Sequence, residues 1–166
     1  MPEDFGDDIP AGPSTLRGRE WPCLRQFCVF LENRVGCLHE LLKLLEESEL
    51  RVMALSVVDT VDFAVVRLIV DEADRARELF TLHGFTMTEN DLLGVEMPDD
   101  PQPFVSVFVP LVSAEINISY AYPLLYGPRG RGALAIHVDN IDQSAQILRD
   151  QGHRLLTEND LQDEFF

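Results

Sequence analysis

The chain has 166 residues, of which 46% are hydrophobic and 25% are charged, and its formal net charge is −16 because it carries 29 acidic and 13 basic residues. This charge argues against a nucleic-acid or membrane-surface partner, since proteins that bind those polyanions gather Lys and Arg on one face. The composition fits a globular protein, and no apolar run approaches the roughly 18 to 20 residues that a transmembrane helix requires. We therefore expect a cytoplasmic protein.

The segment from Met1 to Glu20 is acidic and contains prolines, and it lacks the basic start and the apolar stretch of a signal peptide. Such a segment has too few apolar groups to offset the entropy that ordering it would cost. We therefore expect residues 1–22 to form a flexible acidic arm.

Residues 23–90 predict strands and helices in the order βαββαβ. The strands are apolar or alternating runs bounded by turn residues: Leu24 to Leu31, Arg51 to Val58, Phe63 to Val70 and Phe85 to Glu89. The first helix, which Asn33 is available to cap, has apolar residues at i, i+3, i+4 and i+7: Leu38, Leu41, Leu42 and Leu45. A second helix begins at the acidic residues after Val70 and ends at Gly84. This order predicts an α+β, ferredoxin-like module, with four antiparallel strands and two helices on one face.

A sequence repeat predicts a second copy of this module. Val70 to Gly84 realigns without a gap with Val138 to Gly152, and each copy runs on into Thr-Glu-Asn-Asp-Leu. Because a single unit of about 65 residues buries too little surface, we expect modules at 23–90 and 91–166 to pack side by side with antiparallel sheets. The second copy should contain three strands, one helix and a last strand: Asp91 to Met97, Asn117 to Leu125, Arg131 to Val138, Ile141 to Gln151 and Arg154 to Thr157.

One segment of the second copy gives conflicting signals. Pro103 to Glu115 takes the place of the first helix, but it is rich in β-branched residues and contains Pro110, which removes a helical hydrogen bond at a cost of about 3 kcal/mol. The repeat nevertheless requires a crossover between parallel strands. We expect a kinked, heavily buried helix here.

The loop from Asn33 to Gly36 leads directly from a strand into the start of a helix, where free backbone amides suit a carboxylate. The alternative is a capped helix start with a tight turn. The string Phe30 to Gly36, the amphipathic helix after it, and the strands around Asp59 to Phe63 together resemble tandem ACT-domain proteins. The resemblance is good over residues 24–97.

The resemblance implies a regulatory protein that binds an amino acid at the junction of two modules, without a cofactor. It implies these ligand-binding positions: Asn33, Arg34, Val35, Gly36, Cys37, Leu38, Asp59, Asp62 and Phe63. It also implies a branched-chain or other small amino acid, and it suggests a homodimer and a regulated enzyme subunit as partners.

The second copy keeps this loop less well, because Gln102 stands where the first copy has Gly36. Asp99 and Asp100 are still candidates to meet an ammonium group. Tyr120 and Tyr122 lie two apart on an expected strand, so they share a face, where they either line a ligand site or pack on the sheet.

Other signatures are missing. Three cysteines and four histidines show no metal-binding or disulfide spacing, and we expect Cys28 to pack in the core. Gly127 to Gly132 lacks the ending of a phosphate-binding loop and predicts a hairpin. We therefore expect no enzyme, and the alternative to a ligand sensor is an interaction module that dimerises through its sheet edges.

Overall fold

The computed structural model describes residues 22–32, 35–125 and 132–162, so the acidic arm up to residue 21 and most of the segment from Gly127 to Gly132 lie outside the described part. The elements follow in this order: β1 (Leu24–Glu32), α1 (Cys37–Glu47), β2 (Val52–Asp59), β3 (Phe63–Val70), α2 (Ala73–Leu82), β4 (Thr86–Glu96), α3 (Pro103–Ser113), β5 (Ile118–Leu124), β6 (Ala133–Val138), α4 (Ile141–Asp150) and α5 (Glu158–Gln162). None of the described helices has the length and apolar character needed to cross a bilayer.

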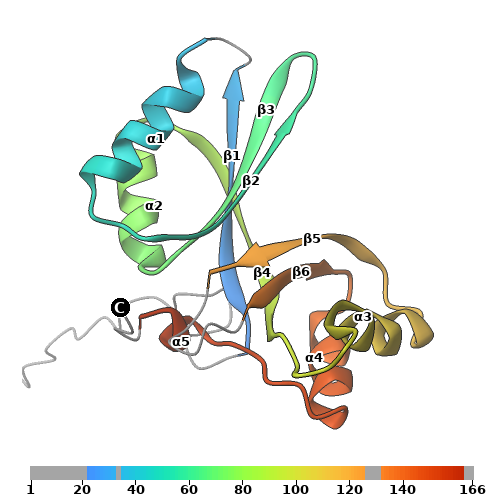
Figure 1. Ribbon diagram of the computed structural model, residues 1–166. Coiled ribbons are helices and arrows are strands. Elements are labelled where there is room, and N and C mark those ends of the chain that lie inside the picture. The colour runs from blue at the N-terminus through green and yellow to red at the C-terminus, as the bar shows by residue number, and fades with distance from the viewer. Residues whose placement is uncertain (1–21, 33–34, 126–131, 163–166) are drawn as a thin grey trace, which may run out of the picture.

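All six strands form one antiparallel sheet in the order β2-β3-β1-β4-β6-β5 (Figure 1). β4 is shared, because it pairs with β1 from Thr86 to Leu92 and with β6 from Leu93 to Glu96. The sequence predicted one strand from Phe85 to Glu89 and another from Asp91 to Met97. This division was wrong, because the structure has a single continuous strand here. Asn90, which lies between the two expected strands, pairs with Gln26 of β1. The backbone pairing of β4 with β1 therefore continues through this position without a turn. The expected side-by-side arrangement of two ferredoxin-like modules is confirmed.

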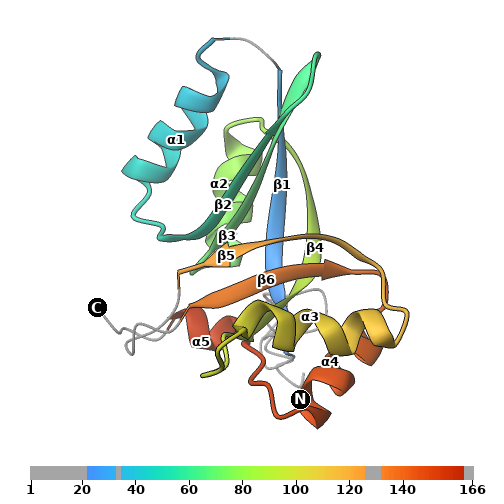
Figure 2. The same ribbon diagram turned by 45° about the vertical axis from the view of Figure 1, so that its right-hand side comes forward.

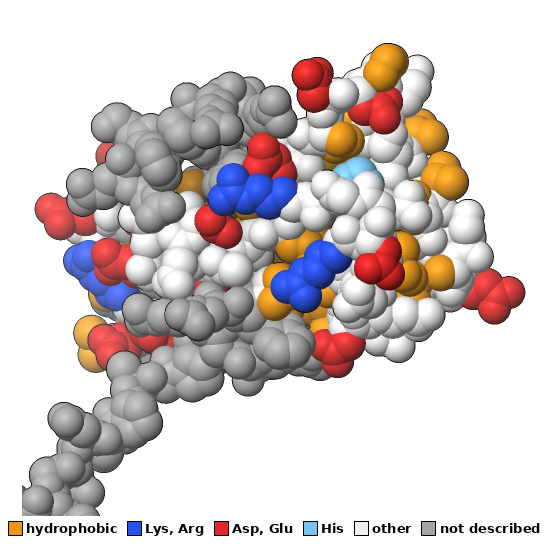
Figure 3. Space-filling model, turned by 90° about the horizontal axis from the view of Figure 1, so that it is seen from below, with side chains coloured by type: hydrophobic (Ala, Val, Ile, Leu, Met, Phe, Trp, Pro, Cys, Tyr) orange, Lys and Arg blue, Asp and Glu red, His pale blue; other side chains and the backbone are white. Residues whose placement is uncertain are grey.

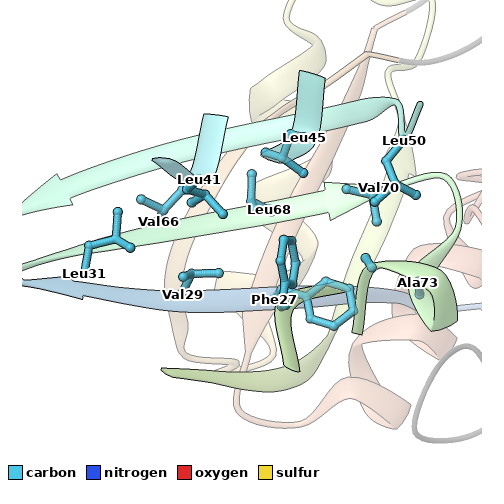
Figure 4. Packing of buried hydrophobic residues seen from close by; sticks show 12 residues of the cluster. Phe27, Val29, Leu31, Leu41, Leu45, Leu50, Val66, Leu68, Val70 and Ala73 are labelled. Atoms are coloured by element: carbon cyan, nitrogen blue, oxygen red, sulfur yellow. The ribbon is translucent and has the colours of Figure 1, made fainter. Parts of the chain in front are cut away.

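The first module buries one face of its sheet under α1 and α2 (Figure 1). Alternate residues of β1 and β3 point at the helices, and the sheet faces Leu41 and Leu45 of α1 and Phe80 of α2. The rings of Phe27 and Phe80 meet edge to face with centroids 5.5 Å apart. Figure 4 shows Leu41 and Leu45 of α1 pointing toward the strand that carries Val66 and Leu68. Burial of this apolar face, at roughly 25 cal/mol per Å², is the main stabilising term for the module.

The second module places α3 and α4 on β4 and β6 and buries a separate core. Its last strand is reduced to a single bridge between Val95 and Leu155, followed by α5, so the expected strand from Arg154 to Thr157 was wrong. The helix expected at Pro110 is present as α3, but only Val107 and Leu111 are buried in it. The expectation of a heavily buried helix was therefore also wrong.

β5 and β6 run across the strands of the first module, as Figures 1 and 2 both show. The end of β5 meets β2, because the N–H of Leu125 donates to the carbonyl of Met53 at 2.8 Å. The enclosed side of the sheet holds a third core, which includes Leu24, Leu92 and Tyr122. This curvature positions the polar side chains of β1, β3 and β5 described below.

Candidate functional site

Gly36 begins the first helix with φ at 102°, a left-handed conformation that glycine adopts without strain. It is the residue that precedes α1 and, as a glycine, it has no side chain with which to cap the helix. Asn33, which the sequence makes available to cap the helix, and Arg34 lie outside the described residues. The first turn of α1 therefore keeps amides without helical acceptors, as the carboxylate-binding interpretation requires.

The β2–β3 turn lies at the same end of the sheet as this loop, because Glu32 pairs with Phe63. Thr60 closes the turn through its hydroxyl, which donates to the carbonyl of Phe63 at 2.5 Å. The structure thus brings most of the first group of expected ligand-binding residues to one end of the molecule: Val35, Gly36, Cys37, Leu38, Asp59, Asp62 and Phe63. Apart from Cys37, which packs against the first core, they are exposed.

The corresponding loop of the second module is organised by Asp100. Its carboxylate accepts the Gln102 N–H at 2.7 Å and the Ser106 hydroxyl at 2.5 Å. These two hydrogen bonds hold the pKa of Asp100 below its usual value, and the bond from Ser106 has the larger effect. Asp99, the other acidic candidate in this loop, is exposed. Asp100 is therefore an ionised acceptor fixed beside the start of α3.

Ser106 and His153 join this group, and sequence reasoning missed both. Pro110 has no N–H, so the carbonyl of Ser106, four residues earlier, loses its helical donor. His153 Nε2 lies 3.2 Å from that oxygen, and the tautomer that carries hydrogen on Nε2 replaces the missing donor. The proline at position 110 was the available signal, because an interior helical proline leaves one carbonyl that needs a partner.

A cavity of about 470 Å³ lies at this loop, within the 300 to 1,000 Å³ range of small-molecule sites. Its lining combines polar groups with an apolar wall and consists of Pro98, Asp100, Val105, Ser106, Val109, Pro110, Gln151, Gly152 and His153. Because Pro103 has no N–H, the orphan amides of the first turn of α3 are those of Phe104 and Val105. The cavity thus offers a carboxylate acceptor and adjoins a helix N-terminus.

Tyr120 and Tyr122 lie apart from both loops, on the enclosed side of the sheet. They share a face, with ring centroids 6.3 Å apart, and both bond to the fully buried Gln26, whose Nε2 donates to Tyr120 at 2.7 Å. The Tyr122 hydroxyl donates to Gln26 Oε1 at 2.5 Å. Burial is the main cause that raises the pKa of Tyr122 far above its usual value, and the nearby Tyr120 raises it further. The two tyrosines therefore pack on the sheet in a hydrogen-bonded network with Gln26.

The face seen from below, with α3 and α4, mixes acidic, basic and hydrophobic side chains (Figure 3). Within residues 22–32, 35–125 and 132–162, no three His, Cys, Asp or Glu side chains are grouped so as to hold a metal ion. Cys28 is buried in the sheet, and no disulfide joins it to Cys23 or Cys37.

The sequence matches the family described as an ACT domain pair over residues 23–164. The fold is similar to that of a protein from Bacteroides thetaiotaomicron, with a TM-score of 0.76 and 26% sequence identity over 85% of this chain and 96% of that chain. It is also similar to the ligand-free regulatory subunit of aspartate kinase from Thermus thermophilus, with a TM-score of 0.53 and 14% identity over 78% of this chain and 92% of that chain. No curated protein matches the chain.

Proposed function

This chain belongs to the ACT domain pair family, and on that premise we propose that it is a regulatory protein that binds a free amino acid and acts on an enzyme subunit. We divide it into an arm at 1–22 and modules at 23–90 and 91–166, with the boundary inside β4. We place it in the cytoplasm, where thiols such as Cys28 stay reduced.

The cavity at the second loop is the observation that carries this proposal. An amino acid needs donors for its carboxylate and an acceptor for its ammonium group. The amides of Phe104 and Val105 at the start of α3 suit the first, and the fixed carboxylate of Asp100 suits the second. Val109 and Pro110 supply an apolar wall, which favours a small apolar side chain such as a branched one.

The loop at Gly36 is proposed as the equivalent site of the first module. It also offers orphan helix amides, with Asp59 and Asp62 nearby as acceptors. The described cavity lies at the second loop, so we rank this site second. Ligand contacts of Asn33 and Arg34 remain part of this proposal.

A thermal-shift screen of the twenty amino acids tests the function. A true ligand at 100 times its dissociation constant should stabilise the fold by about 2.7 kcal/mol. Asp100→Asn should remove most of that gain, while Asp99→Asn, which changes the net charge equally, should keep it. If no amino acid shifts the melting temperature at 10 mM, the ligand-binding proposal fails.

A second candidate function, an interaction module, is favoured by the outer face of α3. The repeat aligns α1 with α3 so that the buried pair Leu41 and Leu45 corresponds to Val107 and Leu111. Exposed polar positions of α1 become valines in α3: His39, Lys43 and Glu46 correspond to Val105, Val109 and Val112. These valines are 53%, 53% and 62% exposed. The fold does not require them, because α1 shows that polar residues serve there.

Light scattering tests this second candidate. A dimer formed through α3 should dissociate in Val109→Lys and persist in Lys43→Ala, the change at the equivalent position of α1. A monomeric parent at 100 μM would reject a homodimer through this face.

A further inference from the structure

Arg67 lies on the face of the first module's sheet that points away from α1 and α2, at the edge of the enclosed side. It pairs with Ser56 on β2 and with Cys28 on β1, and Cys28 pairs with Thr88 on β4. Directly paired residues of antiparallel strands share a face, so these four side chains form one row across the sheet. β5 comes close to this row, since the guanidinium carbon of Arg67 stands 4.0 Å from the ring centre of Tyr120.

Arg67 has no carboxylate partner among the described residues, unlike the other arginines that are partly or fully buried. Arg25 and Arg77 pair with Glu89, at 3.2 and 2.8 Å, and Arg51 pairs with Asp71 at 3.3 Å. In a chain with a net charge of −16, an unneutralised and partly buried guanidinium is unexpected. A buried cation is normally paired because its desolvation is costly.

Two buried nitrogen atoms near Tyr120 also lack hydrogen-bond partners, namely Nε of Arg67 and Nδ1 of His137. The His137 ring stacks on that of Tyr120 with centroids 4.8 Å apart. Burial raises the pKa of the Cys28 thiol, which touches Arg67, so the thiol stays neutral and does not offset the charge. Buried polar atoms without partners are uncommon in native proteins and call for an explanation.

An exposed apolar strip adjoins this row. The next row of paired residues on the same face contains Val58, Val65 and Phe30. The ring centroids of Phe30 and Phe63 lie 6.3 Å apart. Val58 is 43% exposed and Phe30 is 36% exposed. The positively charged guanidinium of Arg67 thus lies beside the exposed apolar strip of Phe30 and Val58.

We propose that Arg67 anchors a second small-molecule site on this face, beside its exposed strip, and that the site takes an organic carboxylate with an apolar body. The carboxylate meets the terminal N–H groups and the charge of the partly exposed Arg67 guanidinium, and the apolar body covers Phe30 and Val58. The Arg67 end of the site is separate from the Gly36 loop, because the end of β1 that leads into that loop lies about 13 Å further along the strand. This proposal does not depend on amino-acid binding at the cavity beside α3, so failure of that binding would not contradict it.

NMR titration of the 15N-labelled full chain with sodium benzoate tests the proposal. Benzoate should shift the Arg67 Nε–H signal and the amides of Cys28 and Tyr120, and it should leave the loop at Asp100 unchanged. Benzyl alcohol, which keeps the ring and lacks the charge, should bind at least about tenfold more weakly. Equal shifts with benzyl alcohol would reduce the site to apolar contact and overturn the proposal.

Variants complete the test. Arg67→Met should weaken benzoate binding at least about tenfold. Arg149→Met removes an exposed arginine of α4 that also lacks a carboxylate partner in the described part of the chain, and it should bind like the parent. If Arg67→Met does not fold, Arg67→Lys keeps the charge, loses the planar guanidinium that can bind a carboxylate with two N–H groups, and should bind several-fold more weakly. Parental affinity in either Arg67 variant overturns the proposal.

Discussion

Glu49 and Glu115 occupy the same position in the two copies of the repeat and share a left-handed backbone, with φ at 62° and 61°. Among the described residues they are the only non-glycine positions with positive φ. Each follows the first helix of its module, where glycine normally ends a helix. The second helices end in this way, at Gly84 and Gly152, so the repeat preserves backbone geometry at both helix ends.

Glu49→Gly and Glu115→Gly should each stabilise the protein. The left-handed conformation costs an L-residue about 1 to 2 kcal/mol, which glycine avoids, although glycine also raises the entropy of the unfolded chain. We expect a net gain of about 0.5 to 1 kcal/mol for each change. Urea denaturation measures it, and the two gains should add because the sites lie in different modules. A loss of stability in both variants would contradict the assigned strain.

Gly94→Ala should destabilise the fold by about 1 to 3 kcal/mol, as overpacking does in a core. A Cβ at Gly94 would lie 2.5 Å from Cδ1 of Leu24 and 3.2 Å from Cβ of Leu156. Gly132→Ala is the matched control, because its Cβ would meet nothing closer than Met97 Cγ at 3.7 Å. Equal midpoints for the two variants in chemical denaturation would show that Leu24 moves aside without cost.

The sequence predicted the module order well because the repeat supplied information that single residues lack. At Pro103 to Ser113 local propensity favoured a strand, and the repeat correctly predicted a helix. It did not predict how far α3 is buried, since burial depends on the packing of whole elements. β4 was divided wrongly into two strands at the boundary between the modules, whereas pairing first with β1 and then with β6 keeps it extended.

The candidate sites were less predictable. Asp100 was found from its charge, but His153 was not, because it lies far along the chain and reaches Ser106 only through the packing of α4 against α3. Arg67 gave no signal at all. Its lack of a carboxylate partner within the described part of the chain is a property of the folded sheet, which local sequence does not encode.

Acidification should remove the contribution that Asp100 makes to stability. The folded pKa of Asp100 is lowered, chiefly by the Ser106 hydroxyl, so the ionised form stabilises the fold above the unfolded pKa of about 3.9. That contribution is lost as the pH falls through the folded pKa. Asp100→Asn should therefore unfold earlier than the parent in urea at pH 7, and the difference should shrink below pH 4. A difference that is constant with pH would contradict this linkage, and Asp99→Asn controls for the change in net charge.

Pro110 and His153 should be energetically coupled through the carbonyl of Ser106. In the parent, His153→Ala leaves that oxygen without its protein donor, which costs about 0.5 to 1.5 kcal/mol. Pro110→Ala restores the helical N–H and should itself stabilise α3, by up to about 3 kcal/mol. In the Pro110→Ala background, His153→Ala should then cost markedly less, because the restored N–H already satisfies the carbonyl. A double-mutant cycle from urea denaturation measures the coupling, which we expect at about 0.5 to 1 kcal/mol. If the two changes add within about 0.3 kcal/mol, His153 does not replace the donor that Pro110 lacks.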